Sequence, residues 1–266
     1  MTAREFLCTP GIQRNGIGAI IKPQELILRL FKEKNAMGLL EKMLSLLAAG
    51  TMVLSGALDE AAPQHNADGT LFLLNREYRV SDAYQPEDLV LTDVLGRERI
   101  RELRPEAAAA LEEMFAACKA EIGVDLIAVS GFRDYAKQSR LWQEKLKSVG
   151  RNVEKAQEYV APPGASEHQL GLAMDIGQRG KAQLSSNFIK TEGGKWATEN
   201  CWRFGFILRY NEGWESVTGY KYEPWHFRYV GRELAKEIHD ANVPFETWLI
   251  GYRVRVLQEM MKEDGP

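Results

Sequence analysis

The chain is poor in several residue types, and each shortage excludes a class of protein. Its 266 residues include only 3 Cys, at positions 8, 118 and 201, which excludes a disulfide framework and a C-x-x-C zinc or redox site. A formal net charge of −3, with no run rich in Lys or Arg, argues against a nucleic-acid partner. With 27% charged residues, nine Tyr and six Trp, the composition is that of a folded protein and not a disordered one.

Long apolar runs are also scarce, and one uncharged stretch is informative. Residues 43–58 contain no charge, yet they fall short of the roughly 20 apolar residues of a membrane-spanning helix. The stretch has the length of a signal-peptide core, and Ser55, Gly56 and Ala57 provide small residues for cleavage. We therefore divide the chain into an N-terminal extension, residues 1–63, and a domain, residues 64–266.

Three interpretations of the extension stay open. It is a signal peptide that starts at an internal Met (37 or 43), a short membrane anchor with a cytoplasmic tail, or an amphipathic helix over 24–49 that packs on the domain. Forty-two residues precede the uncharged stretch without a concentrated positive region, which does not fit a simple signal peptide. We favour the two export interpretations, which predict a location in the cell envelope, outside the cytoplasm, and membrane association if the segment is an anchor.

The domain has the pattern of an α+β fold, with helices and short strands separated by long loops. The clearest helix is 105–122, with Pro at its first turn and Gly123 as its stop signal. Apolar and alternating segments predict strands at 71–74, 125–130, 172–176 and 225–230. Further helices are predicted at 134–148, 196–204, 232–240 and 245–262.

Only four His occur, and two of them stand in dense polar contexts. His168 precedes Asp175 by seven residues, and both could reach one cation if the chain turns at Gly171; a nitrogen and a hard oxygen suit zinc. On this spacing alone, an ordinary loop histidine and a strand-end carboxylate are the favoured interpretation. Neither His65 nor His239 has a neighbouring ligand pattern.

The second polar context is the segment 223–229, EPWHFRY. Strand alternation places His226 and Arg228 on one face and the aromatic residues on the other. Pro224 cannot sit within a central ladder, so Glu223 is expected in the loop before the strand, where it could reach the side of His226. The alternative is an aromatic edge strand with a surface Glu.

A third segment, SGFR at 130–133, ends a predicted buried strand and delivers an arginine. Arg133 could direct its donors at a carboxylate or at a developing oxyanion. The alternative is an ion pair with Asp134 at the start of the next helix.

Together these segments resemble the VanY-type D-alanyl-D-alanine carboxypeptidases, a group of zinc peptidases that also includes D-Ala-D-Ala dipeptidases and hedgehog-like zinc domains. The three motifs occur in family order: S-G-[FY]-R at 130–133, S-x-H-x-x-G-x-A-x-D at 166–175 and E-x-W-H at 223–226. The resemblance implies a small antiparallel sheet that carries a zinc site and is flanked by helices. Its implied residue roles are zinc binding by His168, Asp175 and His226, general base catalysis by Glu223, oxyanion stabilisation or substrate anchoring by Arg133, and substrate contacts by Ser166, Gln138 and Trp225.

The resemblance further implies removal of the terminal D-Ala from peptidoglycan peptides that end in D-Ala-D-Ala. One alternative keeps the zinc site and changes the bond, as in L-alanyl-D-glutamate endopeptidases or D-Ala-D-Ala dipeptidases. Another is a zinc-stabilised binding module of the cell wall without turnover, which would need neither a base at Glu223 nor an oxyanion partner at Arg133.

Overall fold

The computed structural model describes residues 66–97, 100–181 and 184–263. The expectations about residues 1–63, including the uncharged stretch 43–58 and a helix over 24–49, lie outside this part of the chain. Among the residues that are described, no helix is both long enough and apolar enough to cross a membrane.

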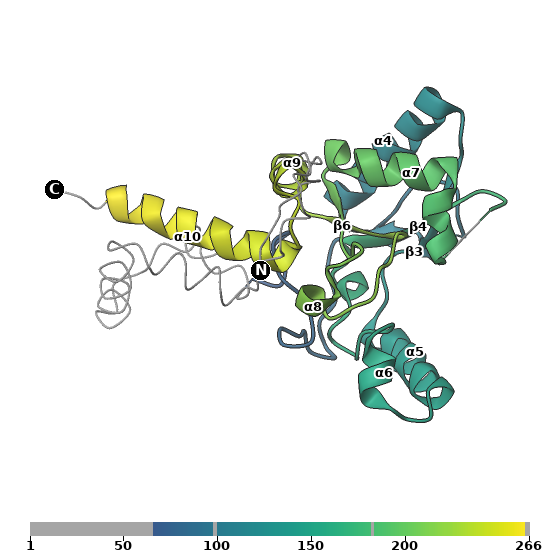
Figure 1. Cartoon of the computed structure of the whole chain (residues 1–266), viewed down its shortest axis with the longest axis horizontal. Helices are drawn as coiled ribbons and strands as arrows, with labels where there is room; N and C mark the ends of the chain where they lie inside the picture. The colour runs from purple at the N-terminus through teal and green to yellow at the C-terminus, as the bar shows by residue number, and fades with distance from the viewer. Residues whose placement is uncertain (1–65, 98–99, 182–183, 264–266) are drawn as a thin grey trace, which may run out of the picture. The chain divides into compact units, whose positions relative to one another are not determined.

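The described chain is a mixed α+β structure, as the sequence predicted (Figure 1). Its strands are β1 (Val90–Leu91), β2 (Glu102–Leu103), β3 (Leu126–Ser130), β4 (Ala173–Gln178), β5 (Phe206–Leu208) and β6 (His226–Tyr229). Its α-helices are α4 (Pro105–Ile122), α5 (Tyr135–Ser148), α6 (Val153–Gln157), α7 (Glu192–Asn200), α8 (Glu215–Thr218), α9 (Arg232–Ala241) and α10 (Phe245–Glu263). Short 3₁₀ helices are η3 (Glu167–Leu170), η4 (Ser186–Lys190) and η5 (Cys201–Phe204).

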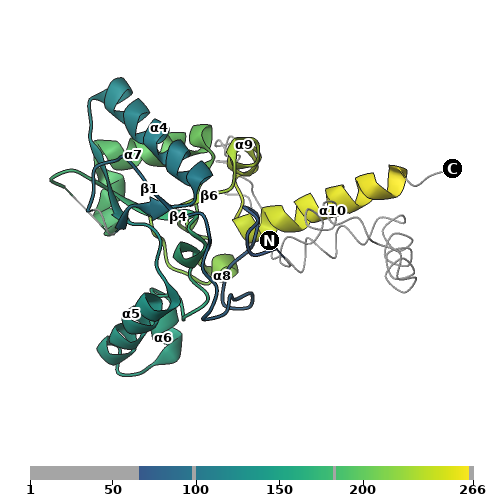
Figure 2. The same ribbon diagram turned by 180° about the vertical axis from the view of Figure 1, so that it is seen from behind.

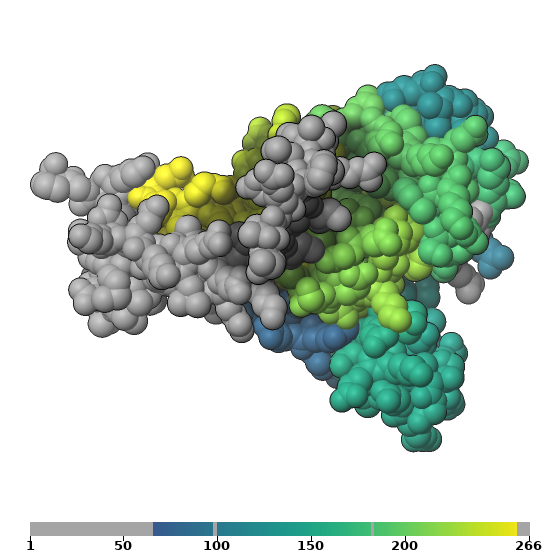
Figure 3. Space-filling model, in the orientation of Figure 1, coloured from purple at the N-terminus to yellow at the C-terminus, as the bar shows by residue number. Residues whose placement is uncertain are grey.

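A four-stranded antiparallel sheet with the order β3-β4-β6-β5 forms the centre of the fold. Both views of the ribbon show α4 and α7 together on one side of this sheet, whereas α5 and α6 lie away from them (Figures 1 and 2). The space-filling view shows the teal α5–α6 segment as a separate projection (Figure 3). The core between sheet and helices is apolar; its fully buried members include Leu103, Leu111, Met114, Phe206 and Phe227.

The predicted helices are confirmed where the sequence carried explicit start and stop signals. Helix α4 has the predicted bounds, and Gly123 ends it in the left-handed conformation at φ 72°. Asp134 caps α5 by accepting a hydrogen bond from the backbone N–H of Lys137 at 2.5 Å. The carboxylates that interact electrostatically with Arg133 in the described chain are Asp175 and Glu223. The helix predicted over 196–204 forms as α7 followed by η5.

The strand predicted at 71–74 is wrong. The segment is buried but irregular, and no strand pairs with it among the described residues. The carbonyl oxygens of Thr70 and Phe72 instead accept hydrogen bonds from Nη2 of Arg228, at 2.8 and 3.0 Å. A buried guanidinium therefore satisfies backbone groups that a sheet would otherwise satisfy.

The remaining Cys and His residues of the described chain lie away from the metal-binding motifs. Cys118 and Cys201 are free thiols in the core, and burial raises their pKa values to about 11 and about 12. His239 is stacked on Trp202, with ring centroids 5.1 Å apart. His239 therefore packs on an aromatic ring, as expected for a histidine without a ligand pattern.

Candidate active site

One cavity of about 200 Å³ collects the predicted site residues. Its lining includes Arg133, Gln138, Ser166, His168, Asp175, Glu223, Trp225 and His226. These residues come from the loop after β3, from α5, from η3 and its flank, from β4, and from the end of the loop before β6 together with the first residue of β6. The fold therefore brings residues that are up to 93 positions apart, from Arg133 to His226, to one place.

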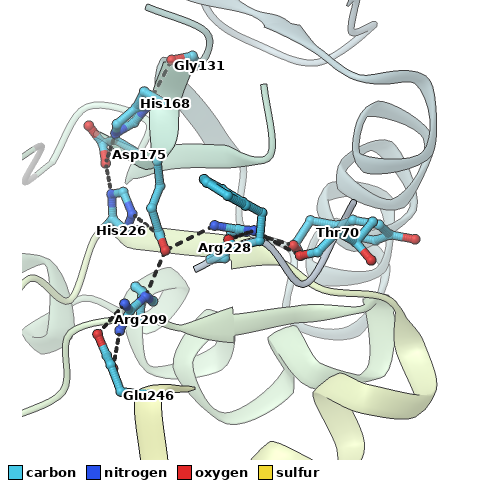
Figure 4. Close-up of polar contacts among 11 residues, drawn as sticks. Thr70, Gly131, His168, Asp175, Arg209, His226, Arg228 and Glu246 are labelled. Atoms are coloured by element: carbon cyan, nitrogen blue, oxygen red, sulfur yellow. Dashed lines mark hydrogen bonds and ion pairs between the residues drawn. The ribbon is translucent and has the colours of Figure 1, made fainter. Parts of the chain in front are cut away.

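Three of these side chains form a compact ligand set. Ligand atoms of His168, Asp175 and His226, all buried, lie within 4.8 Å of one another. Oδ1 of Asp175 is 3.3 Å from Nε2 of His168 and 2.9 Å from Nδ1 of His226 (Figure 4). Both imidazoles thus face the same carboxylate oxygen.

The sheet register fixes the distance between two of the ligands. Asp175 on β4 pairs directly with His226 on β6 across the antiparallel ladder. Residues opposite each other in such a pair project to the same face, with Cβ atoms about 4.5–5.5 Å apart. The backbone hydrogen bonds of the sheet therefore hold a carboxylate and an imidazole side by side.

A glycine turn brings the third ligand to this pair. The helix η3 carries His168 and ends at Gly171, whose φ of 67° is in the left-handed region. A Cβ at Gly171 would lie 2.7 Å from a methyl group of Leu89, so the position also needs the small residue for space. This is the turn at Gly171 on which convergence of His168 and Asp175 depended.

His168 is oriented by a backbone carbonyl. Its Nδ1–H donates to the carbonyl oxygen of Gly131 at 2.8 Å, which leaves Nε2 as the unprotonated nitrogen. The chain after a β-bulge in β3 supplies this carbonyl. Burial and the nearby Arg133 guanidinium lower the pKa of His168 to about 4, so its imidazole is neutral and available as a ligand.

His226 lies between two carboxylates. Its Nδ1 faces Asp175, and its Nε2 lies 3.2 Å from Oε2 of Glu167. Although burial lowers the pKa of His226, hydrogen bonds to these two carboxylates outweigh it and raise the pKa to about 9. Each ring nitrogen therefore carries a proton unless a cation takes the place of the proton on Nδ1.

The donor set fits a zinc ion. Nε2 of His168 has no hydrogen-bond partner within the described chain, although Oδ1 of Asp175 is close to it. An unprotonated nitrogen that faces a carboxylate oxygen is unfavourable unless a cation lies between them. Two imidazoles and one carboxylate are typical ligands of catalytic zinc, and three protein ligands leave a fourth position open. His168 through Nε2, Asp175 through Oδ1 and His226 through Nδ1 would hold the ion.

Glu223 lies in the loop before β6, where Pro224 predicted it. Its backbone N–H donates to the carbonyl of Tyr210 at 3.0 Å, and its own carbonyl accepts from His226 N–H at 3.1 Å. The surrounding protein desolvates its carboxyl group, which faces the cavity, and raises its pKa to about 7. A divalent cation nearby would favour the ionised form and lower this pKa. Glu223 thus presents a carboxyl group to the cavity that holds the ligand set.

The other predicted contacts supply unpaired polar atoms to the cavity. Nε of Arg133 and Oε1 of Gln138 are buried without hydrogen-bond partners in the described chain. Nε2 of Gln138 donates to the carbonyl of Ala161 at 2.7 Å, which fixes its amide and leaves Oε1 as an acceptor. Ser166 and Trp225 line the same cavity. An arginine donor and an amide acceptor are thus available to a peptide.

A buried ionic group, which the sequence motifs did not indicate, lies next to the ligand set. Glu167 accepts hydrogen bonds through Oε1 from Nε of Arg209 at 2.9 Å and from Nη1 of Arg228 at 3.0 Å. Arg209 in turn binds both carboxylate oxygens of Glu246 on α10, at 2.9 and 2.5 Å (Figure 4). The one available signal was that Arg228 shares a strand face with His226. The positions of Glu167, Arg209 and Glu246 along the chain gave no indication of contact.

The chain is similar to a known family and to proteins of known structure. The family model VanY, D-alanyl-D-alanine carboxypeptidase, matches residues 100–232. The bifunctional D-Ala-D-Ala dipeptidase and D-Ala-D-Ala carboxypeptidase VanXYC of Enterococcus gallinarum is 37% identical over 165 residues, which cover 61% of this chain and 84% of that protein.

Two solved structures are also similar to the chain. One is the LD-carboxypeptidase LdcB, at 44% identity and a TM-score of 0.64, covering 68% of this chain and 86% of that one. The other is a mutant of the vancomycin resistance D,D-pentapeptidase VanY in complex with Zn(II), at 35% identity and a TM-score of 0.58, covering 68% of this chain and 98% of that one.

The chain belongs to the VanY D-alanyl-D-alanine carboxypeptidase family. It is an α+β metallopeptidase, and zinc is its cofactor. These comparisons support the catalytic interpretation over a zinc-stabilised binding module.

Replacing a predicted ligand should abolish tight zinc binding. We expect His168→Ala to weaken zinc binding by more than about 100-fold, beyond the range typical of residues that only support a ligand. His239→Ala removes an exposed imidazole that stacks on Trp202, and it should keep the zinc content of the wild type. Metal analysis of both variants after dialysis against a weak chelator checks this. Equal zinc content in the two variants would contradict the ligand assignment.

Proposed function

We propose that the protein is a zinc-dependent D,D-carboxypeptidase that removes the terminal D-Ala from peptidoglycan stem peptides or their precursors. The observation that carries the proposal is the content of one cavity: a His-Asp-His ligand set, a carboxyl group at Glu223 and a guanidinium at Arg133. A metal that only stabilises a fold needs neither of the last two groups. The family match and the VanY relative named above support the choice of bond.

Hydrolysis requires an activated water and a place for the developing negative charge. Bound zinc supplies a Lewis acid that lowers the pKa of water to about 7 and polarises the scissile carbonyl. Glu223 would accept the proton of the attacking water and return it to the leaving amine of D-Ala. The carboxyl group of Glu223 lines the same cavity as the ligand set, which places it to take part in both transfers.

Arg133 would stabilise the negative charge of the oxyanion that forms during hydrolysis. Its guanidinium is desolvated by burial, which lowers its pKa, and it interacts electrostatically with Asp175 and Glu223. Since both of these carboxylates belong to the reaction centre, the oxyanion that forms there is the natural partner of Arg133. Oε1 of Gln138 would accept an N–H of the peptide backbone, and Ser166 and Trp225 would contact the terminal residues.

The cavity rim is the part of the site that can select the length of the peptide. Two exposed side chains line the cavity there: Tyr159, which is 44% exposed and lies close to Lys145 and Lys221, and Leu184, which is 49% exposed.

The similarity to VanXYC and LdcB makes D-Ala-D-Ala dipeptide and tetrapeptide the informative competing substrates. Release of D-alanine should be measured on pentapeptide, tetrapeptide and dipeptide in parallel; preference for pentapeptide supports the proposal, and preference for either other substrate contradicts it.

Removing the charge of Glu223 should stop turnover without releasing the metal. We expect Glu223→Gln to lower kcat by about 10²–10⁴-fold, the usual contribution of a general acid–base group, with full zinc occupancy. Glu212→Gln, at an exposed position after β5, is the matched control and should keep wild-type activity. D-Alanine release from pentapeptide and zinc content are measured on the same samples. Wild-type kcat in the zinc-loaded Glu223→Gln variant would rule out the assigned role.

Replacement of Arg133 separates transition-state stabilisation from substrate anchoring. If Arg133 acts on the oxyanion, Arg133→Ala should lower kcat by about 10²–10³-fold with a small change in KM. A rise in KM with unchanged kcat would show instead that Arg133 binds the terminal carboxylate of the peptide. Steady-state kinetics on pentapeptide distinguish the two results, and partial recovery of kcat in Arg133→Lys would support the electrostatic role.

We propose that residues 1–63 are an export or anchoring segment and that the catalytic domain, residues 64–266, acts outside the cytoplasm. The support is the uncharged stretch 43–58 and the small residues at its end. N-terminal sequencing of the protein from its own cells should find a start after residue 57 if a signal peptide is removed, or an intact segment in the membrane fraction if it is an anchor. An intact Met1 in the soluble cytoplasmic fraction would exclude both.

A further inference from the structure

The C-terminal helix α10 contributes a charge that is connected to the metal site. Glu246 lies in its first turn, beyond the stretch 100–232 that the family model covers. Its two carboxylate oxygens bind Nη1 and Nη2 of Arg209, whose remaining donor, Nε, binds Oε1 of Glu167. Oε2 of Glu167 faces Nε2 of His226. A continuous series of contacts thus joins Glu246 to a zinc ligand.

The balance of charge explains why Glu246 is needed. Oε1 of Glu167 faces two guanidinium groups, those of Arg209 and Arg228, and all three side chains have 0% exposure. One carboxylate cannot neutralise two cations, and an unpaired charge at such a site is strongly unfavourable. The carboxylate of Glu246, whose side chain is 11% exposed, supplies the second negative charge. The group of two Arg and two Glu is then neutral.

The geometry of these contacts also fixes the orientation of the Arg209 guanidinium and of the Glu167 carboxylate. Two parallel hydrogen bonds that Arg209 donates to Glu246 hold the plane of the guanidinium, as in other bidentate arginine–carboxylate pairs. With this plane fixed, Nε of Arg209 holds Oε1 of Glu167. The other oxygen, Oε2, is thereby directed at His226.

We propose that Glu246 is a positioning residue for the zinc site. It holds Arg209 so that Glu167 accepts the Nε2–H of His226 and leaves Nδ1 of that ring for the metal. Histidine ligands commonly donate their second N–H to a carboxylate, and loss of such support weakens metal binding by about 10–100-fold. The proposal concerns zinc affinity, so it goes beyond the choice of peptide bond.

The test compares two Glu→Gln variants of the full chain, each of which disrupts an ion pair that involves α10. Glu246→Gln removes the buried charge, and we expect zinc to bind about 10-fold more weakly, measured by competition with a chromophoric chelator. Glu237→Gln breaks the exposed pair between Glu237 and Arg255, and it should change zinc affinity by less than about twofold. Equal zinc affinity in Glu246→Gln and the wild type would overturn the proposal.

A double-mutant cycle separates this role from a general effect on the fold. If Glu246 acts through Glu167, Glu246→Gln should have little further effect on zinc affinity in a Glu167→Gln background. An undiminished effect in that background, or a Glu246→Gln chain that does not fold even in excess zinc, would show that Glu246 serves the fold alone.

The ring of His226 gives a second readout that needs no substrate. Nitrogen NMR of the zinc-loaded wild type should find the proton of His226 on Nε2, and Glu246→Gln should shift this signal while the Glu237→Gln control does not. A proton on Nδ1 in the wild type would also overturn the proposal. Failure to release D-alanine would overturn the proposed function and would leave these metal and NMR results unaffected.

Discussion

The site depends on a buried carboxylate that must be neutralised where it lies. Glu167 has a fully buried side chain, and two arginines and a histidine contact it. Removing one partner from such a group typically costs about 3–5 kcal/mol, because a charge is left unpaired. The same contacts connect parts of the chain that are far apart, since Arg228 also binds the carbonyls of Thr70 and Phe72. The same interactions therefore connect distant parts of the fold and support the metal site.

The sheet and the loops contribute different groups to the site. Strands β4 and β6 hold Asp175 and His226 in register, and the backbone of Gly131 orients His168. The groups assigned to catalysis, Glu223 and Arg133, lie in the loops that join the sheet. With two candidate ligands on strands and the third on η3, the geometry of the ligand set can stay fixed while the loops around the peptide differ.

Much of this could be predicted from the sequence, and the failures have physical causes. Helix 105–122 was predictable because Pro105 fixes a helical φ at its start and Gly123 readily adopts the left-handed conformation that ends it. The strand at 71–74 was not, because its apolar residues are buried while its carbonyls bind Arg228, a residue over 150 positions away. The eight residues that the motifs indicated line one cavity, whereas Glu167, Arg209 and Glu246 meet through contacts that no local pattern encodes.

The pairing of Asp175 with His226 has a consequence for motion. The backbones of two residues paired across a hydrogen-bonded ladder cannot separate unless the strands part, which is a local unfolding event and not a fluctuation of a loop. The metal-binding centre is therefore expected to stay closed on the timescale of catalysis. Motion that admits a peptide is expected instead from the exposed side chains at the cavity rim, such as Tyr159 and Leu184. Opening of the cavity and hydrolysis of the peptide are thus assigned to different residues, so the rates of these two processes can change independently.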